Sequence, residues 1–555
     1  MAILRQTATM WVRGSRRSLE EWSLWAGRAV AWVSAGCVAG PFFYHVARGS
    51  NAHLGLFEDD YFYYAVVADK LVRLGTLSYD GLTPTNGFHP LWLVVLATLR
   101  LLCGRFGAAF HVALAGLFVA SMVATYELSL RFARSLGTSA LLAPLLAALY
   151  SIATDRLLAC GMETAVAVPL LLYLFVEVAR EEPLTDRRAA KLGFVASMAI
   201  LARLDIAIAV AIVVVAWLAL ARPPLNKAWR TALAFCSGGI LVVGYAVANL
   251  CLFGSVLPVS ALAKHLETGP GVNCELLGFV ATNTVYGRAI GALLPLGVIA
   301  FVVVARRDRR RPRAALLAGG AALLFPFVFY GVNALGGWVF FGWYAYPLAP
   351  AIVASLVFLC EAVAPFVRVG AFARAGTVAG GVVLAAISVR AWRYFVMHGP
   401  RWSVRDNAIL AMGIDLADRV RDRNGVFGMG AMAGFATYMV DKPFVQLEGL
   451  VADRAMVEHV RRQDPLEDVL RAYHVDYLVV SVVKTPLPER DGCFTVTEPS
   501  AEWAGARALK MTGEICSPPI ARFANVRAAD PWAAPFSIET VVFDVRAATW
   551  RARVD

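Results

Sequence analysis

Long apolar runs separated by short polar stretches fill the first 394 residues of the chain. A helix needs about 20 mainly apolar residues to cross the hydrocarbon core of a bilayer, and eleven runs come close to that length. They cover residues 24–46, 107–128, 137–154, 161–179, 191–203, 205–222, 230–252, 286–305, 314–334, 343–363 and 372–393. The pattern therefore predicts a polytopic α-helical membrane protein with about 11 transmembrane helices. The runs on either side of Arg203 and Asp205 are the shortest for a crossing.

The pattern changes near residue 395, where charged residues mix with helical periodicity and short β-rich segments such as Val475–Ser481 and Val541–Val545. This change predicts a membrane domain over 1–394 and a soluble α/β domain over 395–555. Within the second domain, Gly425–Gly434 is typical of a strand, a glycine-rich turn and a helix. Its spacing is GxGxxxG, which differs from the dinucleotide-binding GxGxxG, so we interpret it as a tight strand-to-helix turn.

The distribution of basic residues orients these elements. A twelfth apolar run, 88–103, is short, and counting it as a crossing places several basic clusters outside the membrane. These clusters are Arg131 with Arg134, Arg187 with Arg188, and the run Arg306–Arg313. Cytoplasmic loops carry an excess of Lys and Arg, so we predict that 88–103 is an interfacial helix instead. The N-terminus is then cytoplasmic, and the C-terminal domain faces outward.

Composition agrees with a membrane protein. Of 555 residues, 59% are hydrophobic and 17% are charged, whereas roughly a quarter are charged in soluble domains. The formal net charge of +12 comes largely from short clusters between apolar runs, which points to membrane lipids as partners and against nucleic acid. Cys493 and Cys516 lie in the outward-facing domain, and the sequence leaves open whether they form a disulfide.

Candidate chemistry begins with an acidic pair, Asp59 and Asp60, which stands just beyond the first apolar run on the outer side. Other polar residues embedded in apolar sequence converge on the same side under this topology. They are Asn86, His89, Glu163, Arg203, Asp205 and Lys264. Each alone has a plain explanation as a helix cap or a headgroup contact. Together they indicate a polar site at the outer interface, because ionisable residues at membrane depth tend to line cavities.

The outer location restricts the reactions available there. Nucleotide sugars and ATP are used in the cytoplasm, so an outward-facing transferase needs an activated donor that travels in the membrane, such as a polyprenyl-phosphate sugar. Transfer to a hydroxyl needs a carboxylate to accept the proton, a role that suits Asp59, and a cation to balance the departing phosphate. Lys264, Arg203 or His89 suits the second role. Aromatic residues beside the pair, Tyr63 among them, offer a sugar ring an apolar face.

Several short segments occur in an order that is typical of one superfamily. They are Asp59–Tyr64, Pro84–Trp92, Gly161–Thr164, Ala202–Asp205, Phe253–Pro258 leading to Lys264, and the later Trp343–Pro347, which includes Tyr344. With them the sequence resembles the GT-C superfamily of polyprenyl-phosphate-sugar-dependent glycosyltransferases. That superfamily includes protein O-mannosyltransferases, the aminoarabinose transferase of lipid A and mycobacterial arabinofuranosyltransferases.

The resemblance implies an inverting glycosyltransferase of GT-C type in the bacterial inner (plasma) membrane. It assigns the general base to Asp59, with Asp60 as its neighbour, and it implies that the active site and the C-terminal domain face the periplasm. The donor is a polyprenyl-phosphate-linked sugar, and the acceptor is a glycan, a lipid or a protein. The superfamily includes metal-dependent and metal-independent enzymes, so a divalent cation held by Asp59, Asp60 and His89 stays open, and no cofactor is assigned.

Two other classes of protein compete with this interpretation. A transporter or flippase would use the buried charges as a path through the membrane, but the charges gather at the outer face, and no inverted repeat of broken helices is evident. A membrane-anchored binding protein would leave the spans passive. The sequence does not name the sugar, the acceptor, the form of the donor phosphate or the oligomeric state.

Overall fold

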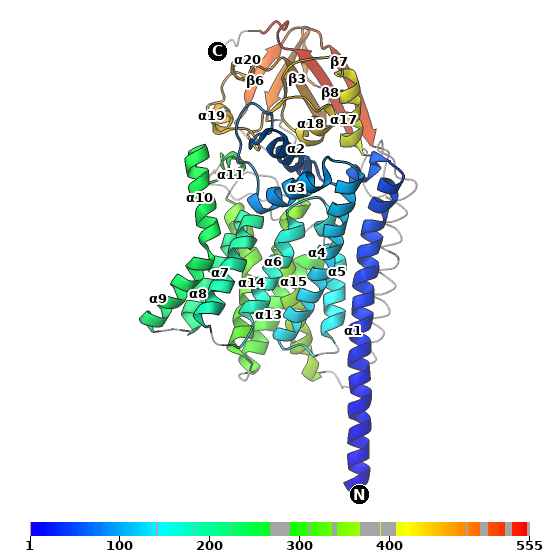
Figure 1. Ribbon diagram of the computed structural model, residues 1–555, viewed down its shortest axis with the longest axis vertical. Coiled ribbons are helices and arrows are strands. Elements are labelled where there is room, and N and C mark those ends of the chain that lie inside the picture. Colours follow the sequence, from blue (N-terminus) through cyan, green and yellow to red (C-terminus); the bar gives the residue numbers. More distant parts are fainter. Residues whose placement is uncertain are drawn as a thin grey trace.

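The computed structural model describes residues 2–139, 142–182, 184–221, 224–266, 289–308, 311–335, 341–366, 389, 407–483, 487–499, 509–527 and 536–551. A bundle of helices forms one part, and an α/β domain covers one end of it (Figure 1). Two helices, α2 (Asp59–Leu74) and α3 (Pro90–Cys103), lie between the bundle and this domain. The acidic pair therefore begins a helix that is enclosed by both parts of the chain.

The elements of the first part follow the apolar runs closely. They are α1 (Ala2–Ala47), η1 (Asn51–Leu56), α2, α3, α4 (Ala108–Ser135), α5 (Ala143–Ala159), α6 (Thr164–Val178), α7 (Asp186–Ala202), η2 (Leu204–Ile206), α8 (Ala207–Ala221), α9 (Leu225–Gly238), α10 (Ile240–Phe253), α11 (Val259–Lys264), α13 (Ala289–Arg307), α14 (Arg313–Asn333), η3 (Gly342–Ala345), α15 (Leu348–Val363) and η4 (Ala364–Phe366). The predicted run 372–393 falls, apart from residue 389, outside the described residues.

Four helical segments among the described residues are long and apolar enough to cross a membrane: Glu20–Ala47, Ala108–Ser135, Arg313–Asn333 and Gly342–Phe366. The predicted run 230–252 is broken, because α9 and α10 meet at a bend of 58° and count together as a fifth candidate. Shorter apolar helices lie at Pro90–Cys103, Thr164–Val178 and Leu204–Leu218. The protein is therefore a multi-pass membrane protein, and the figure of about 11 crossings stays a prediction.

The break that the sequence places between the two shortest runs is present. Helix α7 ends at Ala202, Arg203 has an extended backbone, and η2 begins at Leu204. The run 88–103 forms α3, which starts at Pro90, where a proline is favoured because the first helical amide needs no partner. Figure 1 shows α3 across the end of the bundle, as expected of an interfacial helix.

The basic clusters gather at the other end of the bundle. Arg180, Arg188 and Arg313 line one cavity there, and Arg230 of α9 makes an ion pair of 2.8 Å with Asp186 at the start of α7. Figure 1 shows α9 at the end of the bundle away from the α/β domain. The cationic loops and the acidic pair therefore lie at opposite ends of the bundle, as the positive-inside argument requires.

The α/β domain is built around a five-stranded mixed sheet. Its elements are α17 (Ala408–Arg419), β1 (Phe427–Met429), α18 (Ala433–Val440), β2 (Phe444–Gln446), α19 (Arg454–Arg462), α20 (Leu466–Ala472), β3 (Tyr477–Val483), β4 (Glu489–Arg490), β5 (Cys493–Glu498), β6 (Met511–Ile515), β7 (Ala521–Arg527) and β8 (Phe536–Asp544). The strand order is β2-β1-β3-β8-β7, with β1 parallel to β2 and β3 and with β8 antiparallel to both of its neighbours. A second sheet has the order β4-β5-β6.

For this domain the structure confirms one prediction and answers one question that the sequence left open. Strand β1, a short turn and α18 follow one another, as expected from the strand-to-helix interpretation of Gly425–Gly434. Cys493 and Cys516, whose state the sequence left open, form a disulfide. The predicted domain boundary near 395 lies outside the described residues and stays a prediction.

Candidate functional site

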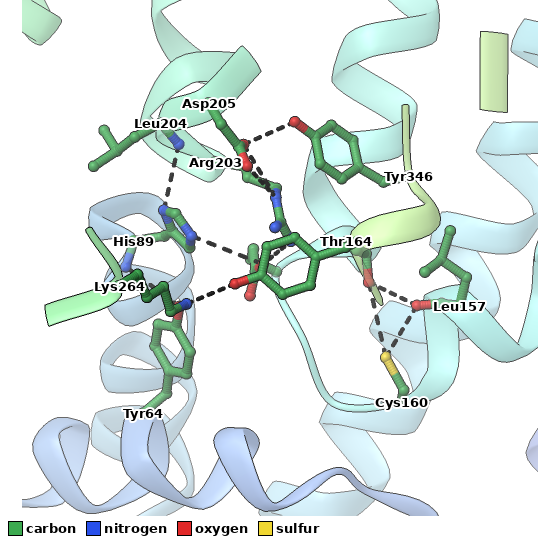
Figure 2. Close-up of polar contacts among 12 residues, drawn as sticks. Tyr64, His89, Leu157, Cys160, Thr164, Arg203, Leu204, Asp205, Lys264 and Tyr346 are labelled. Carbon is green, nitrogen blue, oxygen red and sulfur yellow. Dashed lines mark hydrogen bonds and ion pairs between the residues drawn. The ribbon is translucent and has the colours of Figure 1, made fainter. Parts of the chain in front are cut away.

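The polar site forms where the loops at the outer end of the bundle meet α2. Asp59 and Asp60 start α2, His89 precedes α3, Glu163 precedes α6, Arg203 and Asp205 occupy the α7–η2 break, Lys264 ends α11, and Tyr344 lies in η3. The structure thus brings together residues that are up to 285 positions apart in the chain, from Asp59 to Tyr344. Figure 2 shows His89, Arg203, Asp205, Lys264 and Tyr346 around one polar region.

Asp59 makes direct contact with the α/β domain. Its Oδ1 accepts a hydrogen bond of 2.8 Å from the amide of Phe435, and its Oδ2 accepts one of 3.3 Å from the amide of Gly434. These amides belong to the first turn of α18, where N–H groups lack intrahelical partners and the helix dipole favours negative charge. The glycine-rich turn before α18 therefore presents a helix N-terminus to a carboxylate of the chain's own membrane part.

Gly434 is required for this close approach. A Cβ placed on Gly434 would meet the backbone oxygen of Asp59, and it would lie 3.0 Å from Asp59 Oδ2. Phe62, on the next turn of α2, packs its ring at 4.8 Å from the ring of Phe435. The start of α18 and the start of α2 are consequently fitted to each other by backbone as well as by side-chain contacts.

The aromatic run after the acidic pair takes part in this contact between the two domains. Phe62 also packs against Tyr438 at 5.2 Å, and Tyr63 lies edge-on to Tyr79 at 5.5 Å. The hydroxyl of Tyr79 donates a hydrogen bond of 2.8 Å to the carbonyl of Ala433. Phe62, Tyr63 and Tyr79 are buried, so the run forms a core between α2 and the α/β domain, and Tyr63 lies in that core instead of on an open surface.

Burial raises the pKa of Asp59 to about 7, and the neighbouring charge of Asp60 acts in the same direction. The amides of Phe435 and Gly434 and the hydroxyl of Tyr63 oppose that rise, because they stabilise the ionised carboxylate. Asp59 is thus a carboxyl group that changes its charge near neutral pH while its position is fixed by two amides.

Asp60 has different surroundings. Burial raises its pKa to about 6, and the cations Lys264 and Arg203 limit the rise. Lys264 Nζ donates a hydrogen bond of 2.6 Å to the hydroxyl of Tyr344. Burial lowers the pKa of Lys264, but Tyr344 and Asp60 more than offset this effect, so Lys264 stays protonated. One member of the acidic pair is therefore associated with the α/β domain and the other with the cations.

Arg203 is the most connected residue of the site. Its Nη1 lies 2.5 Å from Glu163 Oε1, and its Nε donates to Asp205 Oδ1 at 3.1 Å. Its guanidinium plane lies 4.6 Å from the ring centre of Tyr344 and 4.4 Å from that of Tyr346. The ion pair with Asp205 that the sequence allowed as a local explanation is present, and the further contact with Glu163 ties α7 to α6.

Glu163 is 1% exposed, and only one of its two carboxylate oxygens has a hydrogen-bond partner among the described residues. Its Oε1 binds Arg203, whereas its Oε2 is buried and has no hydrogen-bond partner among the described residues. The preceding Gly161 has a φ of 86°, and a Cβ there would lie 2.9 Å from the ring of Tyr61. The turn that carries Glu163 therefore packs closely against α2, and Glu163 Oε2 is a buried acceptor without a donor among the described residues.

His89 and Asn86 position other elements. The Nδ1 of His89 accepts a hydrogen bond of 3.3 Å from the amide of Leu204, and its Nε2 lies 3.9 Å from Glu163 Oε1 (Figure 2). Burial, with Arg203 and Lys264, holds the pKa of His89 well below its usual range, so the ring is neutral. Asn86 Oδ1 accepts from the amide of Val259 at 2.8 Å and so fixes the start of the helix that carries Lys264.

The three-ligand metal set considered from the sequence does not form. His89 is directed toward Leu204 and Glu163, and Asp59 is engaged by α18. Among the residues that the structure describes, no group of three or more His, Cys, Asp or Glu side chains is arranged to hold a metal ion. The residues present therefore do not fit a divalent cation held by Asp59, Asp60 and His89.

Sequence reasoning missed two parts of the site. Tyr346 donates a hydrogen bond of 2.8 Å to Asp205 Oδ1 and stacks on Arg203, and its signal was its place beside Tyr344 in an aromatic segment. The amides of Gly434 and Phe435 gave no chemical signal, because backbone groups are common to all residues. Only the glycine-rich turn indicated a helix N-terminus at that point.

Three solved structures have an overall fold similar to that of this chain. They are the Archaeoglobus fulgidus oligosaccharyltransferase in the apo form (TM-score 0.51, 12% identity, covering 82% of this chain and 69% of that one), the archaeal oligosaccharyltransferase AglB from the same organism in complex with an inhibitory peptide and a dolichol-phosphate (0.51, 11%, 83% and 69%), and ArnT from Cupriavidus metallidurans bound to undecaprenyl phosphate (0.51, 15%, 96% and 98%). No protein-family model matches the sequence, and no curated protein matches it.

Proposed function

We propose, on the premise that the chain has the GT-C fold of AglB and ArnT, that it is an inverting glycosyltransferase. It transfers a sugar from a polyprenyl-phosphate donor to a hydroxyl group on the outer face of the inner membrane. The observation that carries the proposal is the juxtaposition of a partly buried carboxylate pair, Asp59 and Asp60, with two cations, the partly buried Lys264 and the buried Arg203.

The reaction needs one bond formed and one broken at the anomeric carbon. The acceptor oxygen attacks that carbon on the face opposite to the lipid phosphate, its proton passes to the carboxylate of Asp59, and the bond from carbon to phosphate oxygen breaks. A raised pKa suits Asp59 to this task, because a general base works best when its pKa is near the operating pH. The amides of α18 hold the carboxylate in a fixed orientation during the transfer.

The cations stabilise the lipid phosphate as it leaves. Lys264 stays protonated through Tyr344 and Asp60, and it stabilises the negative charge that develops on the lipid phosphate. Arg203 is the second cation, and Glu163 and Asp205 hold its guanidinium in place. The unpartnered Oε2 of Glu163 accepts a hydrogen bond from a substrate hydroxyl. Dolichol-phosphate in AglB and undecaprenyl phosphate in ArnT support a polyprenyl phosphate as the carrier.

The topology supports an outward-facing site in the bacterial inner membrane, toward the periplasm. The basic clusters lie at the end of the bundle opposite to the acidic pair, and Lys and Arg are enriched in cytoplasmic loops. The disulfide between Cys493 and Cys516 suits the oxidising periplasm. The acceptor, which is a glycan, a lipid or a protein, therefore meets the donor outside the cytoplasm.

The Asp59→Asn variant tests this proposal. The purified protein is assayed with radiolabelled polyprenyl-phosphate sugars and an envelope extract as acceptor, and both the transferred label and the released lipid phosphate are measured. Loss of a general base lowers kcat by about 10²- to 10⁴-fold, whereas the melting temperature should change little. Asp422→Asn, at an exposed carboxylate of the α/β domain, is the control. Transfer at the wild-type rate by Asp59→Asn would exclude Asp59 as the base.

A further inference from the structure

A polar cavity lies at the end of α2 away from the acidic pair. It has a volume of about 320 Å³ and is formed by the last turns of α2, α3 and α18 with the segments that follow α3 and α18. We name it the basic cleft after the basic residues that line it. They are Lys70, Arg73, Arg100, Arg105 and Lys442. Ten residues of α2 separate Lys70 from Asp60, which places the cleft about 15 Å from the acidic pair along the helix.

The basic cleft has more positive than negative charge. Its lining includes two carboxylates, Asp69 and Asp441, against the five cations. Asp69 pairs with Arg73 at 3.1 Å and with Arg100 at 2.8 Å, and Asp441 lies 3.7 Å from Arg73. Neither Lys70 nor Arg105 has an ion pair with any carboxylate of the described residues. A formal excess of three positive charges remains after the two carboxylates are counted.

Helix ends explain part of this excess. Three helix C-termini meet at the cleft, and each has a partial charge of about −0.5 that favours nearby Lys and Arg. Together they offset about half of the excess, so the cleft keeps a positive potential. Lys442 is one cation with a structural role of this kind. Its ammonium donates hydrogen bonds of 2.8 and 2.9 Å to the carbonyls of Val420 and Arg421. Lys70 and Arg105 have neither a carboxylate partner nor a side-chain hydrogen bond to a carbonyl among the described residues, so their presence at the cleft needs another explanation.

An exposed apolar surface of α3 adjoins the cleft. Leu101 and Leu102, which follow Arg100 on α3, are 69% and 76% exposed. Phe106 also lines the cleft, and its ring lies 5.6 Å from the guanidinium of Arg100. Helix α3 lies across the end of the bundle (Figure 1). A ligand in the cleft therefore has cations around its polar part and an exposed apolar helix surface beside it, which is the arrangement that suits an amphiphile.

We infer that the basic cleft binds the phosphate group of an anionic lipid whose acyl chains lie along the exposed face of α3. Phosphate is the group that several converging Arg and Lys side chains recognise best, and anionic headgroups at a membrane surface attract such clusters. The volume of the cleft is at the lower end of the range for small-molecule sites, about 300–1,000 Å³, so it fits a headgroup and excludes the chains.

Native mass spectrometry tests this inference without any sugar donor, so its failure is distinct from a failure of the proposed transfer reaction. The detergent-purified full chain is titrated with phosphatidylglycerol and, separately, with phosphatidylcholine. We expect one phosphatidylglycerol to bind with an affinity about tenfold or more above that of phosphatidylcholine. Inorganic phosphate should compete with it, since the phosphate group is what the cleft recognises. Equal affinity for the two lipids would overturn the inference.

Variants locate the site. Lys70→Glu combined with Arg105→Glu should abolish the preference for phosphatidylglycerol, and Lys70→Gln with Arg105→Gln should weaken it, which covers the case in which the charge reversals impair folding. The control is Arg490→Glu, whose side chain is 90% exposed in the α/β domain. A preference that survives both double variants would place the lipid elsewhere. Binding of inorganic phosphate without any lipid preference would also overturn the inference, because it indicates a site for soluble anions.

Discussion

Two adjacent carboxylates that look alike in the sequence have different partners in the structure. Asp59 accepts hydrogen bonds from the first turn of α18, whereas Asp60 interacts with Lys264 and Arg203. Successive residues on a helix point about 100° apart, so one faces the α/β domain and the other faces the cations. Under the proposed function, Asp59 is the base, held in place by two amides, and Asp60 is a counter-charge for the cations.

The pH dependence of kcat/KM should report the carboxylate that acts as base. Asp59 has a pKa of about 7, so activity is present above this pH and is lost as the pH falls through it and the carboxylate is protonated. The charge of Asp60 contributes to the rise, so Asp60→Asn should move the acidic limb to lower pH.

The measurement is a profile of kcat/KM for wild type and Asp60→Asn between about pH 5 and 9. If the acidic limb of the Asp60→Asn profile stays at the wild-type pH, or moves to higher pH, the assignment of Asp59 as the titrating base is contradicted.

At the scale of elements, the start of α18 is part of the candidate site, because its amides bind Asp59. The side-chain pattern of Gly425–Gly434 predicted the strand, the turn and the helix, and the structure confirms them. The helix N-terminus that results could have bound an external phosphate in a nucleotide-binding protein. Here it binds the carboxylate of Asp59, because α2 lies directly against it. A short motif thus predicted a local structure correctly, while its partner depended on how distant elements pack.

Gly434→Ala tests the contact between the two helices. The added methyl group would meet the backbone oxygen of Asp59 and crowd its Oδ2, so α18 has to move away. The hydrogen bonds from the amides of Gly434 and Phe435 to the carboxylate would then lengthen or break. We expect kcat/KM to fall about tenfold or more, which corresponds to about 1.4 kcal/mol of transition-state stabilisation.

The matched control is Gly116→Ala in α4, where a Cβ has no neighbour within 4 Å. Steady-state kinetics of both variants, with melting temperatures, separate the local effect from loss of folding. Equal activities would show that the contact does not support transfer.

At the scale of the whole molecule, hydropathy and the distribution of basic residues predicted most of the architecture. The helices follow the apolar runs, α3 lies across the bundle, and a mixed sheet forms the C-terminal part. The bend between α9 and α10 was not predicted, because Gly238 and Gly239 are apolar by composition and do not interrupt the run. The grouping of Glu163, Arg203 and Lys264 was predicted from topology, whereas their pairings depend on distances that no sequence pattern specifies.

Orientation is a property of the whole molecule, and alkaline phosphatase fusions measure it. The reporter is active only outside the cytoplasm, so a fusion after Asp555 should be active in intact bacteria. A fusion within the basic loop between α13 and α14, at Arg311, should be inactive. The reverse pattern would place the acidic pair in the cytoplasm, where soluble sugar donors are present, and would remove the argument for a lipid-linked donor.

The hydrogen bond between Asp59 and Phe435 also bears on how the protein is made. It joins residues 376 positions apart, so one half of it emerges from the ribosome early and the other half long afterwards. Asp59 therefore lacks this hydrogen bond while the later helices are inserted and until the α/β domain has been translocated. If the protein acts as proposed, we expect the nascent chain to be inactive until Phe435 has crossed the membrane and can bind Asp59.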